Sequence, residues 1–222
     1  NRRAFNWGRL AAHRADYVKE SAKLDETVVQ ERSLPDLVEH RAELLVAYQD
    51  RTYAERYRAL VARVQSAEQG LGGAELPLTR TVATCLYKLM AYKDEYEVAR
   101  LYSDPAFQRK LSQTFAGDYS LSFHLAPPIF NRGLDAQGRP RKSRFGSWMM
   151  PSFRLLARFK FLRGTAFDPF GRLAERREER ELIEDYSTLL EEVLAGLSAD
   201  KLAVAIECAR LPDQVRGFGP VK

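Results

Sequence analysis

Residues 33–65 read SLPDLVEHRAELLVAYQDRTYAERYRALVARVQ, and this stretch decides the fold class. It opens with a helix start signal, in which an N-cap serine is followed by Pro35 and Asp36 in the first turn. Apolar side chains then recur at helical spacing, with one phase slip near Arg51. About thirty residues at 1.5 Å each give roughly 45 Å of helix. A helix of that length suggests an antiparallel hairpin or an arm against another domain.

Helical spacing also predicts further helices on both sides of this stretch. They cover residues 4–23, 78–102, 104–115, 151–162, 175–193 and 199–210, the last capped by Ser198. The run 175–181 is so rich in Glu and Arg that we expect a solvated helix face. Gly70, Gly72 and Gly73 are expected to end the long helix, because no strand precedes them to make a nucleotide-binding glycine motif.

One segment changes its period from 3.6 to 2. Apolar and polar residues alternate from Tyr119 to Leu125, which predicts a strand with one apolar face, and residues 144–148 are expected to return as a second strand. The predicted fold is therefore mainly α, a helical domain with long helices plus a small β-hairpin. We expect one domain over residues 1–222, with the option of a helical arm over 1–73 and a main body over 74–222.

The composition is that of an ordinary soluble globular protein, with 45% hydrophobic and 29% charged residues. The first residue is Asn1 rather than Met, so we expect that the chain starts inside something larger or was trimmed. An apolar run of about eighteen residues is the least that spans a bilayer, and the sequence has none, so no membrane partner is expected. It also lacks the pattern of a signal peptide.

Few groups are suited to metal or covalent chemistry. Cys85 and Cys208 are too few for an iron–sulfur cluster, and the apolar neighbours of Cys85 at helical spacing predict a buried thiol. His124 shares the polar strand face with Ser120 and Ser122, which allows a Ser–His nucleophile pair in principle. Same-face strand neighbours stand about 7 Å apart, so we favour a structural or surface histidine.

The formal net charge of +5 is concentrated in one short segment. Between Asn131 and Arg144 there is one acid against five basic residues, which are the candidate partner-binding residues Arg132, Arg139, Arg141, Lys142 and Arg144. Such a loop can bind phosphate or an acidic protein, although a solvated hairpin loop is the favoured interpretation. The charge is too mild for a nucleic-acid binder to be favoured.

Five stretches of the sequence, taken together and in order, are more specific than the composition. They are KLMAYKDEYEVARLY (88–102), FHLAPP (123–128), GRPRK (138–142), RGTAFDPFG (163–171) and RGFGPVK (216–222). In this order they resemble the C-terminal region of the large, single-chain indolepyruvate:ferredoxin oxidoreductases. The resemblance runs from roughly residue 76 to the end of the chain.

The resemblance implies a parent enzyme that oxidatively decarboxylates aryl pyruvates to acyl-CoA. That enzyme would use thiamine diphosphate with a magnesium ion, an iron–sulfur cluster, and ferredoxin as electron acceptor. The present chain has no Gly-Asp-Gly motif and no cysteine cluster, so no catalytic, cofactor-binding or metal-binding residue is carried over, and no cofactor is expected in this segment. The parent is expected to be cytoplasmic and a homodimer.

Two classes of function follow. The first is a non-catalytic C-terminal domain that supports the oxidoreductase by assembly or by contacts with the preceding domains, ferredoxin or CoA. The candidate domain-interface residues are Lys93, Asp94, Glu95, Arg100, His124 and Arg216. Four of these residues could also line an active site: Lys93, Asp94, Glu95 and Arg100. Surface ion pairs on a helix are the favoured interpretation. The second class is a stand-alone helical binding module that uses the basic loop for nucleic acid or an acidic protein.

Overall fold

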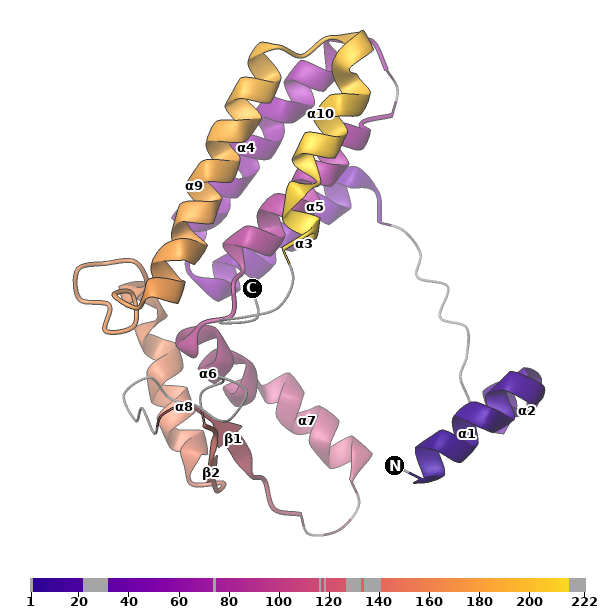
Figure 1. Cartoon of the computed structure of the whole chain (residues 1–222). Coiled ribbons are helices and arrows are strands. Elements are labelled where there is room, and N and C mark those ends of the chain that lie inside the picture. The colour runs from indigo at the N-terminus through magenta and orange to yellow at the C-terminus, as the bar shows by residue number, and fades with distance from the viewer. Residues whose placement is uncertain are drawn as a thin grey trace. The chain divides into compact units, whose positions relative to one another are not determined.

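A computed structural model shows a mainly α protein, as the sequence predicts (Figure 1). The structure describes residues 2–21, 32–73, 75–115, 117, 119–126, 133 and 141–215. The chain divides into two compact units, Asn1–Ser33 and Leu34–Lys222. The first unit contains α1 (Arg2–His13) and α2 (Ala15–Ser21), where we predicted one helix over 4–23. The hydrogen bonds continue across the break, since Arg14 N donates to Leu10 O at 2.7 Å.

The long helix predicted from residues 33–65 is in fact a helical hairpin of α3 (Leu34–Tyr48) and α4 (Arg51–Gln69). The break falls at the phase slip. Asp50 is extended there and its side-chain Oδ1 accepts a hydrogen bond from Tyr53 N at 2.8 Å, so it caps α4. Helices α3 and α4 pack against each other. The suggested hairpin is therefore present, but it is formed within residues 34–69, and the single helix of about 45 Å is wrong.

The glycines after α4 end the helix as predicted, and Gly72 has a φ of +82° that favours glycine. The last turn of α4 also starts the next helix, α5 (Pro77–Met90). Glu68 is buried, and its carboxylate accepts hydrogen bonds from Leu78 N at 2.8 Å and from Thr79 N at 2.7 Å. These N–H groups lie in the first turn of α5 and have no partner within the helix, so Glu68 supplies the cap that Leu76 lacks.

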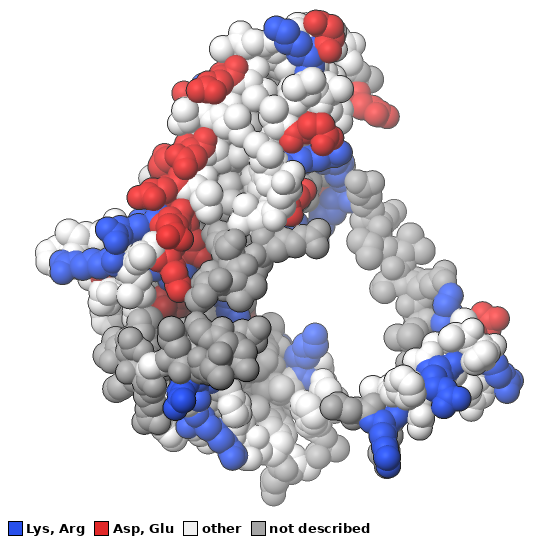
Figure 2. All heavy atoms as spheres, in the orientation of Figure 1, with Lys and Arg blue, Asp and Glu red and all other residues white. Residues whose placement is uncertain are grey.

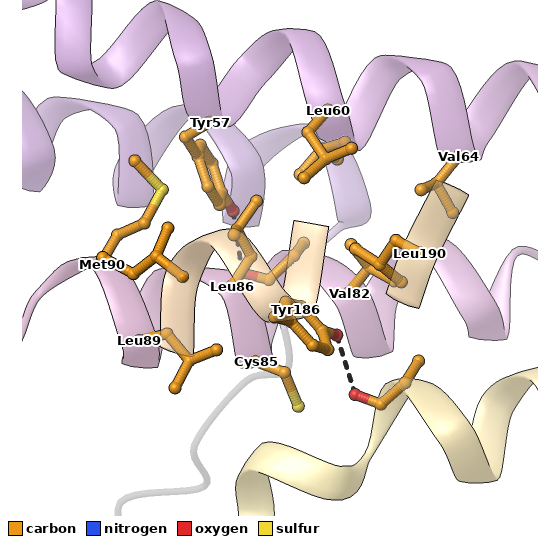
Figure 3. Packing of buried hydrophobic residues seen from close by; sticks show 14 of the residues in the cluster. Tyr57, Leu60, Val64, Val82, Cys85, Leu86, Leu89, Met90, Tyr186 and Leu190 are labelled. Atoms are coloured by element: carbon orange, nitrogen blue, oxygen red, sulfur yellow. Dashed lines mark hydrogen bonds between the residues drawn. The ribbon is translucent and has the colours of Figure 1, made fainter. Parts of the chain in front are cut away.

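The main core lies between α3, α4, α5, α9 (Ala174–Ala195) and α10 (Leu202–Ala209), and Figure 3 shows part of it. Two tyrosines in this core donate to backbone carbonyls: Tyr57 to Ala83 O at 2.9 Å and Tyr186 to Ala209 O at 2.8 Å. Cys85 is buried here, which confirms the prediction. Because α3 and α4 share this core with α5, the structure has no boundary at residue 73, and the compact-unit boundary follows Ser33.

A second apolar cluster brings together α6 (Glu95–Ser103), α8 (Met149–Arg158) and the hairpin of β1 (Phe123–Leu125) and β2 (Ser143–Phe145). The strands are antiparallel, with Phe123 opposite Phe145, and both are shorter than predicted. The predicted helix 78–102 is two helices, since α5 ends at Met90 and Asp94 caps α6. The predicted helix 104–115 is confirmed as α7 (Pro105–Thr114).

Short 3₁₀ turns complete the described part of the chain. They are η2 (Phe159–Leu162), η3 (Ala199–Lys201) and η4 (Leu211–Asp213). The predicted helix 199–210 therefore begins as η3 and becomes α10. Ser198 occupies the predicted N-cap position, but its side chain makes no capping hydrogen bond. None of the helices formed by the described residues is both long and apolar enough to cross a membrane.

Candidate functional site

Asp94 and Arg163 form a buried ion pair. Asp94 lies between α5 of the main core and α6 of the second cluster, and Arg163 lies between α8 of the second cluster and α9 of the main core. Arg163 Nε lies 2.5 Å from Asp94 Oδ2 and Arg163 Nη2 lies 3.0 Å from Asp94 Oδ1, so the guanidinium fork binds both carboxylate oxygens. Each side chain is only 3% exposed. Asp94 Oδ1 also accepts from Glu97 N at 2.8 Å as the cap of α6. Burial alone lowers the pKa of Arg163, but the hydrogen bonds to Asp94 outweigh it and the pKa is raised.

The same guanidinium group caps the end of α3. Arg163 Nη1 donates to Tyr48 O at 2.6 Å, and the guanidinium carbon lies 3.7 Å from the centre of the Tyr48 ring. Lys160 Nζ donates to Ala47 O at 2.6 Å and to Val46 O at 3.2 Å. The last carbonyls of a helix lack partners within it and carry partial negative charge, so two cations stabilise this end. Burial and neighbouring guanidinium groups lower the pKa of Lys160.

Two tyrosines tie the adjacent end of α5 into this site. Tyr53 Oη donates to Met90 O at 2.9 Å and Tyr48 Oη donates to Tyr92 O at 3.0 Å. Burial raises the pKa of both phenols well above the usual value near 10. Each phenol therefore stays protonated near neutral pH and acts as a hydrogen-bond donor rather than as a general base.

Asp168 organises the loop that follows η2. Its Oδ1 accepts from Tyr96 Oη at 3.1 Å and from Phe170 N at 3.0 Å, and its Oδ2 accepts from Gly164 N at 2.9 Å. Gly164 has a φ of +74°, which favours glycine. A Cβ on Gly171 would lie 2.7 Å from Asp168 Oδ2, so this glycine allows the close approach. We name Asp94, Arg163, Tyr48, Tyr96, Asp168 and Lys160 together the polar joint.

A second charged cluster joins α6 to α9. Arg176 Nε lies 3.2 Å from Glu95 Oε2, and Arg176 Nη1 lies 2.5 Å from Glu179 Oε2. Burial lowers the pKa of Arg176, but the charges of Glu95 and Glu179 outweigh it and the pKa is raised. The run 175–181 was predicted to be a solvated face. This is wrong for Glu179, which is 4% exposed, because the start of α9 packs its charges against α6.

Comparison with known proteins places the second compact unit in a family. Residues 34–222 match a family described as "Family of unknown function (DUF6537)". The chain belongs to the DUF6537 family. No curated protein and no solved structure matches it. The match begins at Leu34, the residue at which the second compact unit begins. The polar joint thus lies wholly within the DUF6537 region.

The candidate interface residues of the DUF6537 region have different surroundings. Asp94 is buried in the polar joint, so the favoured prediction of surface ion pairs is wrong for it. Glu95 pairs with Arg176, and Arg100 pairs with Glu97 at 2.7 Å on the same helix, as i, i+3 pairs do. The other three candidates are Lys93 and His124, which are exposed, and Arg216, which lies outside the described residues.

Among the residues that the structure describes, His124 of the DUF6537 region gains no catalytic partner. Its Cα lies opposite that of Arg144 across the hairpin, and its side chain is exposed, which fits the surface histidine that we favoured. Ser122 Oγ accepts a hydrogen bond from Arg144 Nε at 3.1 Å. Within the described residues, no group of three or more His, Cys, Asp or Glu side chains could hold a metal ion.

Part of the candidate basic loop is described, and it borders a hollow. Arg132 and Arg139 lie outside the described residues, whereas Arg141, Lys142 and Arg144 are exposed. These three side chains, with Ser143 and Phe145, line a hollow of about 630 Å³. Three cations around a hollow can bind phosphate or carboxylate groups.

Sequence reasoning missed most of the polar joint. Arg163 and Asp168 fall in a stretch whose one signal is the family resemblance, and Lys160 and Tyr48 fall in segments for which the sequence predicts only a helix. A signal was present for Arg163 and Lys160, since both are cations in the otherwise apolar segment 159–163. Lys160 and Arg163 bind the last carbonyls of α3, and Arg163 also binds Asp94 at the start of α6. The sequence does not predict where α3 ends or where α6 begins.

Proposed function

We propose that this chain is a non-catalytic C-terminal domain of a fused indolepyruvate (aryl 2-oxoacid):ferredoxin oxidoreductase. It supports oxidative decarboxylation to acyl-CoA through domain assembly or partner contacts. The parent is a cytoplasmic homodimer that carries thiamine diphosphate, magnesium and an iron–sulfur cluster in its preceding domains. The proposal rests on the ordered sequence resemblance and on what the residues of two of its stretches do in the fold.

The main support for this proposal is that the stretches 88–102 and 163–171 contact each other in the fold. Asp94 of the first binds Arg163 of the second, and Tyr96 of the first donates to Asp168 of the second. These polar groups are buried and satisfied by one another. A catalytic acid, base or nucleophile needs a polar group that can reach a substrate. These four buried residues therefore support a role in holding the domain's shape.

An assay of isolated residues 34–222 tests this function. We expect a cooperatively melting helical protein with no turnover of indolepyruvate in the presence of CoA and an acceptor dye. We also expect no calorimetric signal for thiamine diphosphate at micromolar concentrations. Turnover or micromolar binding by the isolated chain would contradict the proposal. The positive counterpart uses the native full-length polypeptide, which is expected to catalyse the reaction and to lose it when residues 34–222 are deleted.

A second candidate function is a stand-alone binding module for an acidic partner. The hollow lined by Arg141, Lys142 and Arg144 favours it, since these exposed cations lie together. The mass and domain content of the native polypeptide separate the two candidates. A polypeptide without thiamine-binding domains would favour the module.

A further inference from the structure

Helix α8 buries one face, and large apolar side chains also lie on its opposite, outer face, at Leu155 and at the two residues that flank the helix, Trp148 and Phe159. On the inner face, Phe153 is buried in the second apolar cluster. On the outer face, Trp148, Leu155 and Phe159 are 65%, 57% and 41% exposed. Their spacing of seven and four residues places them on one stripe of the helix, roughly 17 Å long at 1.5 Å per residue. Large apolar side chains that are exposed at successive turns mark a candidate contact surface.

The stripe continues at both ends. Phe161 is 60% exposed, and its ring centre lies 6.1 Å from that of Phe159. At the other end the ring of Trp148 lies 6.0 Å from that of Phe145, which lines the basic hollow. We call Trp148, Leu155, Phe159 and Phe161 the aromatic ridge. Exposed apolar side chains that occur singly need no explanation, whereas a contiguous set marks an interaction site.

The surroundings of the aromatic ridge are positively charged. Residues 141–173 contain eight Lys and Arg but only one acid, Asp168, which is buried. Arg154 and Arg158 are exposed and lie along one edge of the ridge by helical spacing. Neither pairs with a carboxylate of the described residues. Figure 2 shows acidic side chains gathered instead along α9.

The acids at the start of α6 are already engaged. Helix α6 packs on α8, and its acidic residues bind other cations. Asp94 binds Arg163, Glu97 binds Arg100, and Glu95 binds Arg176. These acids therefore do not pair with Arg154 or Arg158. A partner surface that complements the two arginines must supply carboxylates.

We propose that the aromatic ridge docks onto an apolar protein surface edged by carboxylates, contributed by another domain of the same polypeptide. This inference rests on the proposed function, which makes the chain one part of a larger polypeptide. The ridge and its edge combine Trp, Phe and Arg, which are enriched at protein interfaces. Aliphatic Leu155 at its centre offers no stacking surface for a nucleic-acid base. The aromatic ridge lies beside the basic hollow, so the surface is uneven. A protein surface of complementary shape fits it better than the flat surface of a lipid bilayer.

Photo-crosslinking in the native full-length polypeptide tests the docking. The photoreactive residue p-benzoylphenylalanine replaces Leu155 in one variant and Val204 in a control, because Val204 is 64% exposed on α10, away from the ridge. We expect position 155 to crosslink to a carboxylate-rich segment outside residues 34–222 of the same polypeptide, and position 204 to give none there. Crosslinks from 155 to lipid, to nucleic acid or to a second copy of residues 34–222 would overturn the proposal, as would a yield no higher than at 204.

Charge reversal adds a second readout. The double change Arg154→Glu and Arg158→Glu is expected to lower the crosslink yield roughly tenfold, since like charges then face each other. Arg177→Glu, on the exposed face of α9, is the matched control and is expected to leave the yield unchanged. Unchanged yield in the double variant would show that carboxylates do not edge the partner surface. Oxidoreductase activity is measured separately, so that a crosslinking but inactive native polypeptide refutes the proposed function and leaves the docking intact.

Discussion

Asp94 and Arg163 are 69 residues apart in the sequence and form a two-point ion pair that is almost fully buried. Asp94→Asn removes the charge but keeps a side chain able to cap α6. The change leaves the Arg163 guanidinium without its counter-ion in the interior. We expect a loss of about 3–5 kcal/mol in the free energy of unfolding, measured by urea titration.

The control for this change is the exposed pair of Arg56 and Glu184, whose side chains are 44% and 65% exposed. Exposed pairs contribute little, so Arg56→Gln is expected to cost less than about 1 kcal/mol. Equal losses in Asp94→Asn and Arg56→Gln would mean that the buried pair adds nothing beyond a surface contact.

Gly171→Ala tests the packing of the loop around Asp168. The new Cβ would lie 2.7 Å from Asp168 Oδ2, so the carboxylate must move and weaken its hydrogen bonds. We expect a destabilisation of about 1–3 kcal/mol by thermal or urea unfolding. Gly196→Ala is the matched control, because the nearest atom to its Cβ would lie 4.0 Å away. A neutral Gly171→Ala would show that the loop relaxes freely.

Buried Cys85 predicts a loss of stability at alkaline pH. Burial raises the pKa of its thiol to about 11, above the ordinary value near 9. The folded state therefore holds the thiol proton more tightly than the unfolded state does, and this contribution is complete below pH 9 and is lost as the pH rises towards 11. We expect Cys85→Ala to show a shallower fall in stability over this range than the native chain, measured by urea titrations at successive pH values. A Cys208→Ala control is expected to keep the native slope.

The basic loop predicts a salt-dependent contact. Replacing Arg139, Arg141 and Lys142 by Gln in the full-length enzyme should raise the apparent KM for ferredoxin or CoA at low salt. The effect should fade at high salt, since the Debye length falls from roughly 30 Å at 0.01 M to about 3 Å at 1 M. Circular dichroism checks that the fold is intact, and Arg63→Gln on α4 is a control for the loss of one exposed positive charge elsewhere. A triple variant equal to the native enzyme at low ionic strength would leave the loop a solvated turn.

The helical fold could be predicted because its signals are local. Apolar spacing and the Ser33 start signal lie within single turns, and the alternation from residue 119 located the hairpin. The helix breaks were harder. Asp50 and Asp94 both begin new helices as caps. Asp94 lies in a charged stretch that also fits an unbroken helix, whereas Asp50 lies beside an interruption of the apolar spacing. The phase slip near Arg51 was the one visible sign.

The polar joint could not be predicted in the same way, because its contacts are distant in sequence. Asp94 lies in the run KDEYE (93–97), which looks like an exposed charged face. Burial of the Asp94 carboxylate is favourable only because Arg163, the residue after η2, binds it. The sequence near Asp94 contains no signal that predicts this partner. Glu179 was misjudged for the same reason, since its burial depends on how α9 meets α6.

The cations at the end of α3 also set an order of events during synthesis. Lys160 is 113 residues downstream of Ala47, the carbonyl of which it caps. At roughly 5–20 residues per second, a ribosome needs about 6–20 s to make the intervening chain. The α3–α4 hairpin is complete at Gln69, so for most of that interval it lacks the groups that cap the end of α3. A chaperone or an early neighbouring domain that shields this hairpin would therefore act before the polar joint can close.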